Sequence, residues 1–182
     1  MMIVSIVGMA GSGKSEVAKI LERNGFLRIR FGDITDAEVR KRGLEFNEAS
    51  ERYIREQLRK EHGMAAYAEL SLPEIDSRLK LADVVVDGLY SWEEYTLLKS
   101  RYGERFVVVA VHASPRIRYE RLAKRQVRPL TREEAMSRDA AEIEKSNKGG
   151  PIAMADFVIM NESSVDNLED STRRLLAALG CK

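Results

Sequence analysis

The stretch from Ser5 to Leu21, SIVGMAGSGKSEVAKIL, limits the choice of fold more than any other part of the chain. Four of its residues fit the pattern G-x-x-x-x-G-K-[ST]: Gly8, Gly13, Lys14 and Ser15. In a loop of this kind the backbone N–H groups point inward at the positive end of a helix and cradle phosphate groups. The pattern predicts that a nucleotide binds here.

The sequence on both sides of this loop agrees with the motif. The run from Met2 to Val7 is apolar and β-branched, as expected of a buried strand. After the loop, Val17, Ala18 and Leu21 fall on one side of a helical pattern, which Asn24-Gly25 ends. The alternative is an ordinary glycine-rich turn between a strand and a helix, but the motif coincides with the strand–loop–helix context that it requires.

The motif also assigns roles to individual residues. Lys14 is expected to reach the β- and γ-phosphates of ATP, and the Ser15 hydroxyl is expected to bind Mg²⁺. The residues expected to contact ATP are Gly8, Met9, Ala10, Gly11, Ser12, Gly13, Lys14, Ser15 and Glu16. ATP and Mg²⁺ are therefore the predicted cofactors.

At 182 residues the chain is long enough for one domain with a full core. Its 30 Lys and Arg residues against 29 Asp and Glu leave a net charge of +1, which provides no bulk attraction to nucleic acids or to anionic membranes. No apolar run approaches the length of a membrane span, and the start MMIV is typical of a first strand rather than a signal peptide. The single cysteine, Cys181, excludes a disulfide framework and indicates a reducing compartment, the cytoplasm.

Strand-like runs alternate with helical ones along the chain. After the first strand, further strands are expected at residues 26–31, 82–86, 106–111 and 156–159. Helical periodicity fills the interval between the second and third strands, with breaks expected at Gly43, Gly63 and Pro73. This alternation predicts an α/β fold in three layers, with a five-stranded parallel sheet covered by helices on both faces.

Two carboxylates are expected at the carboxyl ends of the strands, where parallel sheets bind their ligands. Asp87 ends the run ADVVVDG and is a candidate Mg²⁺ ligand; the alternative is a turn aspartate paired with Gly88. Asp33 follows the second strand, in a position to accept a proton from an attacking hydroxyl or to orient the waters of Mg²⁺. A helix cap is an equally good interpretation of Asp33.

A basic row follows Ser114-Pro115, which is a typical helix start. The row contains Arg116, Arg118, Arg121, Lys124, Arg125 and Arg128 against one acid, Glu120. The spacing of Arg118, Arg121 and Arg125 predicts one helical face, suited to clamp a transferring phosphoryl group. The alternative is a solvated basic face.

Five segments of the chain together resemble a known protein family: GMAGSGKSEVAK, GDI, VVVDG, VAVHASPRIRYERLAKR and ADFVIMNESSVDNLED. They are similar to an archaeal family of kinases labelled adenylate-kinase-related or dephospho-CoA-kinase-related, within the nucleoside monophosphate kinase superfamily. The last segment resembles a stretch that lies near the adenine of ATP in dephospho-CoA kinases. By this resemblance, Asn161 is expected near the adenine.

The resemblance spans nearly the whole chain and implies a single P-loop kinase domain over residues 1–182. Within this domain, residues 33–80 are implied to form a mobile helical segment that binds the acceptor, and residues 116–148 are implied to form a lid. Arg121 and Arg125 match the lid arginines that contact the ATP phosphates, and Arg138 is a further candidate. The resemblance therefore implies that Arg121 and Arg125 act in catalysis together with Lys14 and Asp33.

The chain departs from nucleoside monophosphate kinases at two places. Asp36 stands where those enzymes have an arginine that grips the acceptor's phosphate, and Tyr90 and Ser91 stand where a second arginine is expected. A second carboxylate would repel an acceptor phosphate, whereas a hydroxyl acceptor, as in dephospho-CoA, needs no such clamp and benefits from a carboxylate base. The rival hypothesis is an adenylate kinase in which Arg40 or Arg59 replaces the missing arginine.

Three classes of function compete. A GTPase-like switch would need Asn-Lys-x-Asp to recognise guanine, and the chain has only NKGG at residues 147–150. An ATPase that drives another machine or a nucleic-acid transaction fits poorly with the balanced charge and the single domain. The sequence favours an ATP-dependent kinase that acts on a small nucleotide-like molecule. Trp92 and Tyr95 are expected to pack rather than to line the acceptor pocket.

Overall fold

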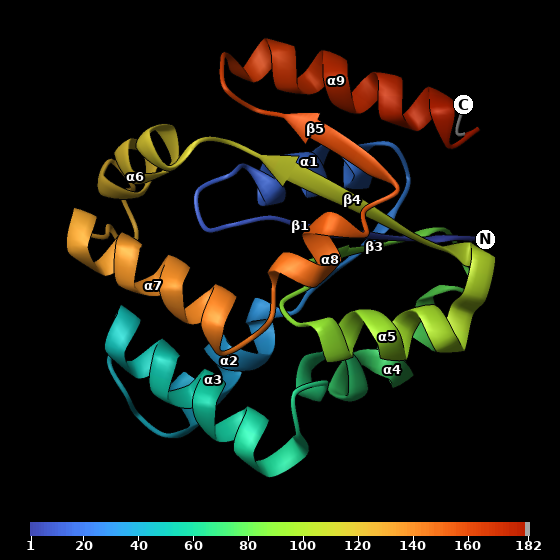
Figure 1. Ribbon diagram of the computed structural model, residues 1–182. Helices are drawn as coiled ribbons and strands as arrows, with labels where there is room; N and C mark the ends of the chain where they lie inside the picture. Colours follow the sequence, from blue (N-terminus) through green and yellow to red (C-terminus); the bar gives the residue numbers. More distant parts are fainter. Residues whose placement is uncertain (181–182) are drawn as a thin grey trace.

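The computed structural model describes residues 1–180; Cys181, and with it the expectation of a reducing compartment, lies outside the described residues. One sheet crosses the molecule (Figure 1). Its strands are β1 (Ile3–Val7), β2 (Leu27–Arg30), β3 (Val84–Asp87), β4 (Phe106–His112) and β5 (Phe157–Met160). All neighbouring strands run parallel, in the order β2-β3-β1-β4-β5.

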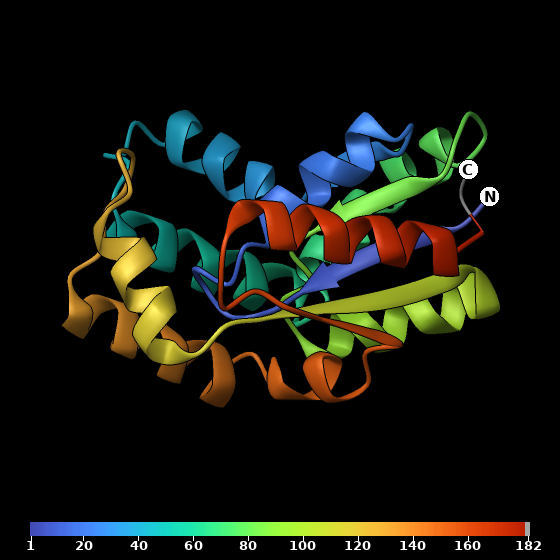
Figure 2. The same cartoon turned by 90° about the horizontal axis from the view of Figure 1, so that it is seen from above.

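Helices cover both faces of this sheet. One face carries α1 (Lys14–Arg23) and α9 (Val165–Ala178), and the other carries α2 (Gly32–Lys41), α3 (Glu48–His62), α4 (Ala66–Arg78), α5 (Trp92–Tyr102) and α8 (Gly149–Ala153). A short 3-10 helix, η1 (Gly103–Arg105), follows α5. Both views place α6 (Pro115–Ala123) and α7 (Arg132–Glu144) at the end of the sheet away from the N-terminus (Figure 2).

The strands are apolar on both sides because both sides are buried, as is usual in parallel sheets. Val84 and Val86 of β3 point into the core formed with α2 to α5, whereas Val85 between them points into the core formed with α1 and α9. This arrangement confirms the predicted fold class, a parallel five-stranded sheet between two helical layers. No helix within residues 1–180 has the length and apolar character needed to cross a membrane.

The expected helix break at Pro73 is wrong, because α4 continues through this residue. A proline inside a helix leaves the carbonyl four residues earlier without its N–H partner. That carbonyl belongs to Glu69, and both Glu69 and Pro73 lie on the exposed side of α4, where water is available to the carbonyl. The expected breaks at Gly43 and Gly63 are confirmed, since both glycines lie between helices at positive φ.

The basic row does not form one helical face, because α6 ends at Ala123. Arg125 lies in the connection to α7, and Arg128 adopts the left-handed conformation at φ 57°. The residue before a proline avoids the helical region, and Pro129 follows Arg128. Arg118 and Arg121 therefore remain on the helix, while Arg125 is carried away from them by the connection.

The segment after β3 turns into α5 through a capping box. Ser91 accepts a hydrogen bond from the backbone of Glu94, and Glu94 in return accepts from the backbone N–H groups of Tyr90 and Ser91 at 2.7 Å and 3.2 Å. Glu94 is completely buried, and burial raises the pKa of its carboxyl to about 7. This turn fixes the direction in which Tyr90 leaves the sheet.

The buried Glu94 predicts a measurable pH dependence of stability. Because its folded-state pKa of about 7 exceeds the value in the unfolded chain, the folded state binds the extra proton between about pH 4.5 and pH 7. Its contribution to the free energy of unfolding is therefore fully present at low pH and is lost as the pH rises through 7. Between pH 4.5 and pH 8, the free energy of unfolding of Glu94→Gln is expected to rise relative to that of the wild type by on the order of 3 kcal/mol.

Urea unfolding of both proteins between pH 4.5 and pH 8 measures this difference. The exposed residue Glu104, in the 3-10 helix η1 that follows α5, provides the control as Glu104→Gln. Parallel stability curves for the wild type and Glu94→Gln would contradict the prediction.

Candidate nucleotide and acceptor site

The loop between β1 and α1 is shaped by glycines in backbone conformations that other residues avoid. Gly11 and Gly13 have φ values of +80° and +102°. A side chain on Gly11 would meet the carbonyl oxygen of Arg118 at 2.8 Å, and one on Gly13 would collide with the amide of Asn161. The loop is thus packed between α6 and the segment after β5, which leaves little freedom in its curvature.

The loop presents free backbone donors. The N–H groups of Gly11, Gly13, Lys14 and Ser15 donate to no acceptor within residues 1–180. Those of Lys14 and Ser15 open α1, where the helix dipole adds positive potential. Orphaned donors at a helix start are the donor set that a polyphosphate needs, so the loop fits the phosphates of a nucleotide.

Lys14 lies over this loop without a carboxylate partner among the described residues. Its ammonium donates to the carbonyl oxygens of Gly8 at 2.8 Å and Met9 at 3.1 Å. Burial, followed by the nearby charge of Lys148, lowers the pKa of Lys14 to about 7. An anion beside Lys14 would oppose both effects, so this side chain is suited to phosphate rather than to a structural ion pair.

A magnesium site has two of the expected residues but no carboxylate cluster. Ser15 opens α1, and Asp87, 3 % exposed, ends β3 on the neighbouring strand. One oxygen of Asp87 accepts a hydrogen bond from Arg28 at 2.6 Å. Within residues 1–180 no group of three or more metal-binding side chains exists. The residues fit a Mg²⁺ ion that is held mainly by phosphate oxygens and water, as is usual for this ion.

Asp33 and Asp36 share one face of α2, where Arg30 binds both. Arg30 donates to Asp33 at 2.6 Å and to Asp36 at 2.9 Å, and Arg128 donates to Asp36 at 3.2 Å. Burial opposes the effect, but these two arginines hold the pKa of Asp36 below its ordinary value. Asp36 is therefore a neutralised carboxylate, and the repulsion expected against an acceptor phosphate has no source here. The side chain of Asp33 is 68 % exposed and lines a surface pocket beside Arg28 rather than the phosphate loop.

Arg121 and Asn161, expected apart on the lid and near the adenine, lie in contact. Arg121 donates to the backbone oxygen of Asn161 at 3.0 Å and to its side-chain oxygen at 3.3 Å. The Asn161 amide in turn donates to the backbone oxygen of Ser12 at 2.8 Å. This connection ties α6 and the segment after β5 to the phosphate loop.

Arg118 has a different environment from the rest of the basic row. It is 4 % exposed and forms a bidentate pair with Asp139 of α7, at 2.9 Å and 2.6 Å. The same guanidinium donates to the backbone oxygens of Ala10 and Ala113 at 3.0 Å. Arg118 therefore fastens the phosphate loop to α6 and α7, a structural role that its sequence neighbours did not indicate.

Two hollows rich in arginine lie beside α3 and α7. A cavity of about 170 Å³ lies between α3 and α7, lined by Arg55, Arg59, Tyr90, Arg138 and Glu142 among others. An open cleft of about 310 Å³ lies beside it and is lined by Arg30, Arg125, Arg128 and Arg138. The side chain of Arg125 has no hydrogen-bond or ion-pair partner within residues 1–180, although it lines the cleft.

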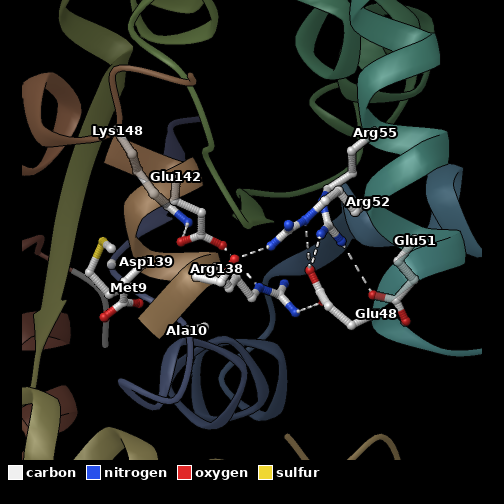
Figure 3. A network of polar contacts seen from close by, with 12 residues as sticks. Met9, Ala10, Glu48, Glu51, Arg52, Arg55, Arg138, Asp139, Glu142 and Lys148 are labelled. Atoms are coloured by element: carbon white, nitrogen blue, oxygen red, sulfur yellow. Dashed lines mark hydrogen bonds and ion pairs between the residues drawn. The ribbon is translucent and has the colours of Figure 1, made fainter. Parts of the chain in front are cut away.

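Figure 3 shows how carboxylates hold Arg138 and Arg55, two of the arginines that line the cavity. Arg138 lies between Glu142, at 3.2 Å, and Glu48 of α3, at 2.9 Å. Glu48 also binds Arg55 at 2.5 Å. On the other side, Lys148 donates to Glu142 at 2.8 Å. Ion pairs thus run without interruption from α8 through α7 to α3.

The residues expected at the acceptor site separate into two groups. Tyr90 and Arg59 line the cavity, with the Arg59 guanidinium 5.6 Å from the ring centroid of Tyr67. Arg40 is exposed and lies over Phe46, outside the lining of either hollow. Trp92 and Tyr95 stack on each other with ring centroids 5.1 Å apart, consistent with packing.

Lys148 and Glu142 belong to the site although no sequence motif singles them out. Lys148 is completely buried, although it lies in the polar segment NKGG that was considered only for guanine recognition. Burial of Lys148 and the positive φ of Asn147 make this segment the entry to α8 rather than a base-reading loop. The spacing of Arg138 and Glu142, four residues apart on a helix, was the available signal that both side chains face the same site.

The fold and the phosphate loop define the class: a P-loop protein with the fold of small-molecule kinases. The shikimate kinase of Bacteroides thetaiotaomicron superposes with a TM-score of 0.64 at 16% identity, over 98% of each chain. A gluconokinase of Sinorhizobium meliloti 1021 superposes with a TM-score of 0.58 at 16% identity, over 98% of this chain and 95% of the other. The sequence profile of AAA_18, described as an AAA domain, matches residues 4–145.

The chain belongs to the UPF0200 family. It is 38% identical over 179 residues to the UPF0200 protein TK1334 of Thermococcus kodakarensis, covering 96% of each chain. It is 37% identical over 180 residues to a UPF0200 protein of Hyperthermus butylicus, covering 98% of this chain and 95% of the relative. These comparisons confirm the kinase-like P-loop fold and do not single out adenylate kinases or dephospho-CoA kinases.

Proposed function

We propose that the protein is an ATP-dependent phosphotransferase that passes the γ-phosphoryl group to a small, anionic, nucleotide-like acceptor. One observation carries this proposal: Arg138 and Glu142, which line the arginine-rich cavity, lie within electrostatic reach of Lys14 in the phosphate loop. A site for a polyphosphate thus adjoins a separate cavity of suitable size for part of a second small molecule. That juxtaposition is what a kinase requires, since donor and acceptor must lie in line.

On the donor side, the loop from Gly8 to Glu16 is proposed to hold the phosphates and Lys14 to neutralise charge between the β- and γ-phosphates. Ser15 and Asp87 are proposed to hold Mg²⁺, which supplies charge neutralisation at the phosphate oxygens when bound. Asn161 and Arg121 are proposed to contact the adenine. The Arg121–Asn161–Ser12 connection supports this assignment because it joins that segment to the loop.

On the acceptor side, residues 33–80 and the lid at 116–148 are proposed to enclose the second substrate. α7 already bridges to α3 through Arg138–Glu48 at 2.9 Å, Lys145–Glu56 at 3.1 Å and a hydrogen bond from Arg52 to Ser137 at 3.1 Å. The cations of this region favour an anionic acceptor, with Arg125 and Arg59 the least engaged by carboxylates. On substrate binding, anionic groups of the acceptor would replace internal carboxylates as partners of these cations.

We propose a hydroxyl group as the nucleophile, as in dephospho-CoA. Asp36 and Tyr90 stand where nucleoside monophosphate kinases have arginines, and the stretch around Asn161 resembles dephospho-CoA kinases. Shikimate, bound in one of the similar structures, a shikimate kinase, is a hydroxylated molecule without a phosphate. The exposed position of Asp33 and its pair with Arg30 favour no direct role as a base in this conformation.

A second candidate, an adenylate or other nucleoside monophosphate kinase, is favoured by a specific observation. Arg30 and Arg128 both bind Asp36, so two guanidinium groups surround the position of the missing arginine. Arg59 adds a third cation at the cavity. These arginines provide the groups of a phosphate clamp. They come from other segments of the chain than the position of Asp36, where the arginine was expected.

Phosphoryl transfer from ATP to dephospho-CoA, shikimate, AMP and CMP, compared in one assay with Mg²⁺, tests the two candidates. Faster transfer to a hydroxyl acceptor than to AMP or CMP would support the leading proposal. Efficient formation of ADP from AMP, lost on Arg59→Ala but retained on Arg40→Ala, would establish the second candidate instead, because Arg40 lies outside the hollows. ATP turnover that is equal with and without every acceptor would contradict both.

The separate positions of Arg121 and Arg125 predict opposite kinetic effects. Arg121→Ala is expected to raise the KM for ATP about tenfold with little change in kcat, since it holds the proposed adenine segment. Arg125→Ala is expected to lower kcat on the order of 10²-fold, since its unpaired charge faces the cleft. The exposed neighbour Lys124 supplies the control variant Lys124→Ala. Equal effects of both substitutions on kcat would contradict the assignment.

A further inference from the structure

Lys148 is a buried ammonium with spare hydrogen-bonding capacity. The residue is 0% exposed, and it is among the largest side chains that are fully enclosed. An ammonium has three donors. Within residues 1–180 it makes one hydrogen bond, to Glu142 at 2.8 Å, and it lies 4.9 Å from the ring centroid of Tyr90. At least one N–H group therefore remains for a further acceptor.

Lys148 lies between the phosphate loop and the cavity proposed for the acceptor. Both of its partners, Glu142 and Tyr90, line the cavity between α3 and α7. Its charge is also the strongest charged influence on Lys14, whose pKa falls through burial and then through Lys148. Lys148 thus lies within electrostatic reach of the phosphate loop while in contact with the wall of the acceptor cavity.

A purely structural origin for this pair is poorly supported by energetics. Taking an ammonium and a carboxylate out of water costs so much that apolar residues of similar size often stabilise a core better. Glu142 already has a partner in Arg138, so it does not need Lys148 for neutralisation. Two ammonium groups that repel each other in one buried space favour an anion between them.

Lys148 also places a cation directly against Tyr90. Tyr90 occupies the stretch after β3 where nucleoside monophosphate kinases carry an arginine. The ammonium of Lys148 lies over the face of that tyrosine ring, so a cation returns to this place from α8. The positive charge that is missing at Tyr90 is thus replaced by that of Lys148, which comes from a segment far away in the sequence.

We propose that Lys148 is a catalytic residue that binds the transferring phosphoryl group opposite Lys14, an inference that rests on the proposed phosphotransferase function. Its free N–H groups donate to the equatorial phosphoryl oxygens while the bond to the leaving β-phosphate oxygen breaks and the bond to the acceptor oxygen forms. Lys148 gives up no proton in this step; the acceptor hydroxyl loses its proton to solvent or to a base. Glu142 holds the ammonium in place, with Arg138 on its other oxygen.

The test measures binding of ADP, and of ADP with aluminium fluoride and Mg²⁺, a mimic of the transferring group that needs no acceptor. Glu142→Gln is compared with Glu142→Gln/Lys148→Met, because the double variant leaves no unpaired buried charge at the pair. Thermal unfolding establishes that both are folded. Lys148→Met alone is measured as a second variant.

Both variants of the matched pair are expected to bind ADP within about threefold of each other. The gain in affinity that aluminium fluoride gives is expected to fall at least about tenfold when Lys148 is replaced, in either background. An equal gain with and without Lys148 would overturn this inference and leave the proposed function standing. Failure of the wild-type protein to bind either ATP or ADP would overturn the proposed function and this inference together.

Discussion

Replacement of Lys14 by alanine is expected to lower phosphoryl transfer by about 10³-fold or more and to leave the fold intact. The transferring group carries its charge on oxygens beside Lys14, and preorganised cations there supply a large share of the rate enhancement. Folding does not need this ammonium, because within residues 1–180 its hydrogen-bond partners are only the carbonyl oxygens of Gly8 and Met9. Its pKa, lowered to about 7 first by burial, indicates that the folded state disfavours the charge.

Turnover of ATP and the free energy of unfolding, measured on the same preparation, check this prediction. Lys19→Ala, on the exposed side of the same helix and paired only with Glu16, is the matched control and should leave turnover unchanged. A well-folded Lys14→Ala protein that turns over at the wild-type rate would remove the active site from this loop. Unfolding of Lys14→Ala would contradict the second half of the prediction.

Arg118→Met is expected to have the largest effect on stability, a loss of about 3–5 kcal/mol in the free energy of unfolding. Removal of the guanidinium leaves the Asp139 carboxylate buried without its bidentate partner. It also removes the N–H groups that donate to the backbone carbonyl oxygens of Ala10 and Ala113, which lie in the same buried region. Arg118 also attaches the phosphate loop to α6 and α7, so nucleotide affinity should fall as well.

Urea unfolding provides the measurement, with Arg116→Met as the matched control. Arg116 precedes Arg118 by two residues in α6, but its side chain is 74% exposed and pairs only with Glu120, so a change within about 0.5 kcal/mol is expected. The double variant Arg118→Met/Asp139→Leu should recover much of the lost stability, because no charge remains buried. A single variant as stable as the wild type would show that the pair has no structural importance.

The fold was predictable from sequence because its signals are local. The glycine pattern of Gly8 and Gly13, the β-branched runs and the glycine breaks each act within a few residues, and each is confirmed in the structure. Pro73 shows the limit of such signals, since only the orientation of α4 decides whether water reaches the freed carbonyl. Local sequence cannot report which side of a helix the rest of the chain will cover.

The candidate site was predictable only in its loop. The role of Asp36 depends on Arg128, 92 residues later, and the environment of Asn161 depends on Ser12, 149 residues earlier. Such contacts follow from the packing of whole elements and leave no pattern in the sequence. The carboxylate of Asp36 therefore suggested repulsion, whereas two arginines neutralise it.

The ion pairs form one series of alternating charge: Lys148, Glu142, Arg138, Glu48, Arg55, Glu51, Arg128, Asp36, Arg30 and Asp33. Each inner member has a partner of opposite charge on either side, so the loss of one leaves two neighbours mismatched. In evolutionary terms, a substitution at Glu48 is acceptable only if Arg55 or Arg138 changes with it. Among UPF0200 sequences, these positions are therefore expected to vary in compensating pairs, so that each sequence keeps its charges balanced across α8, α7, α3 and α2.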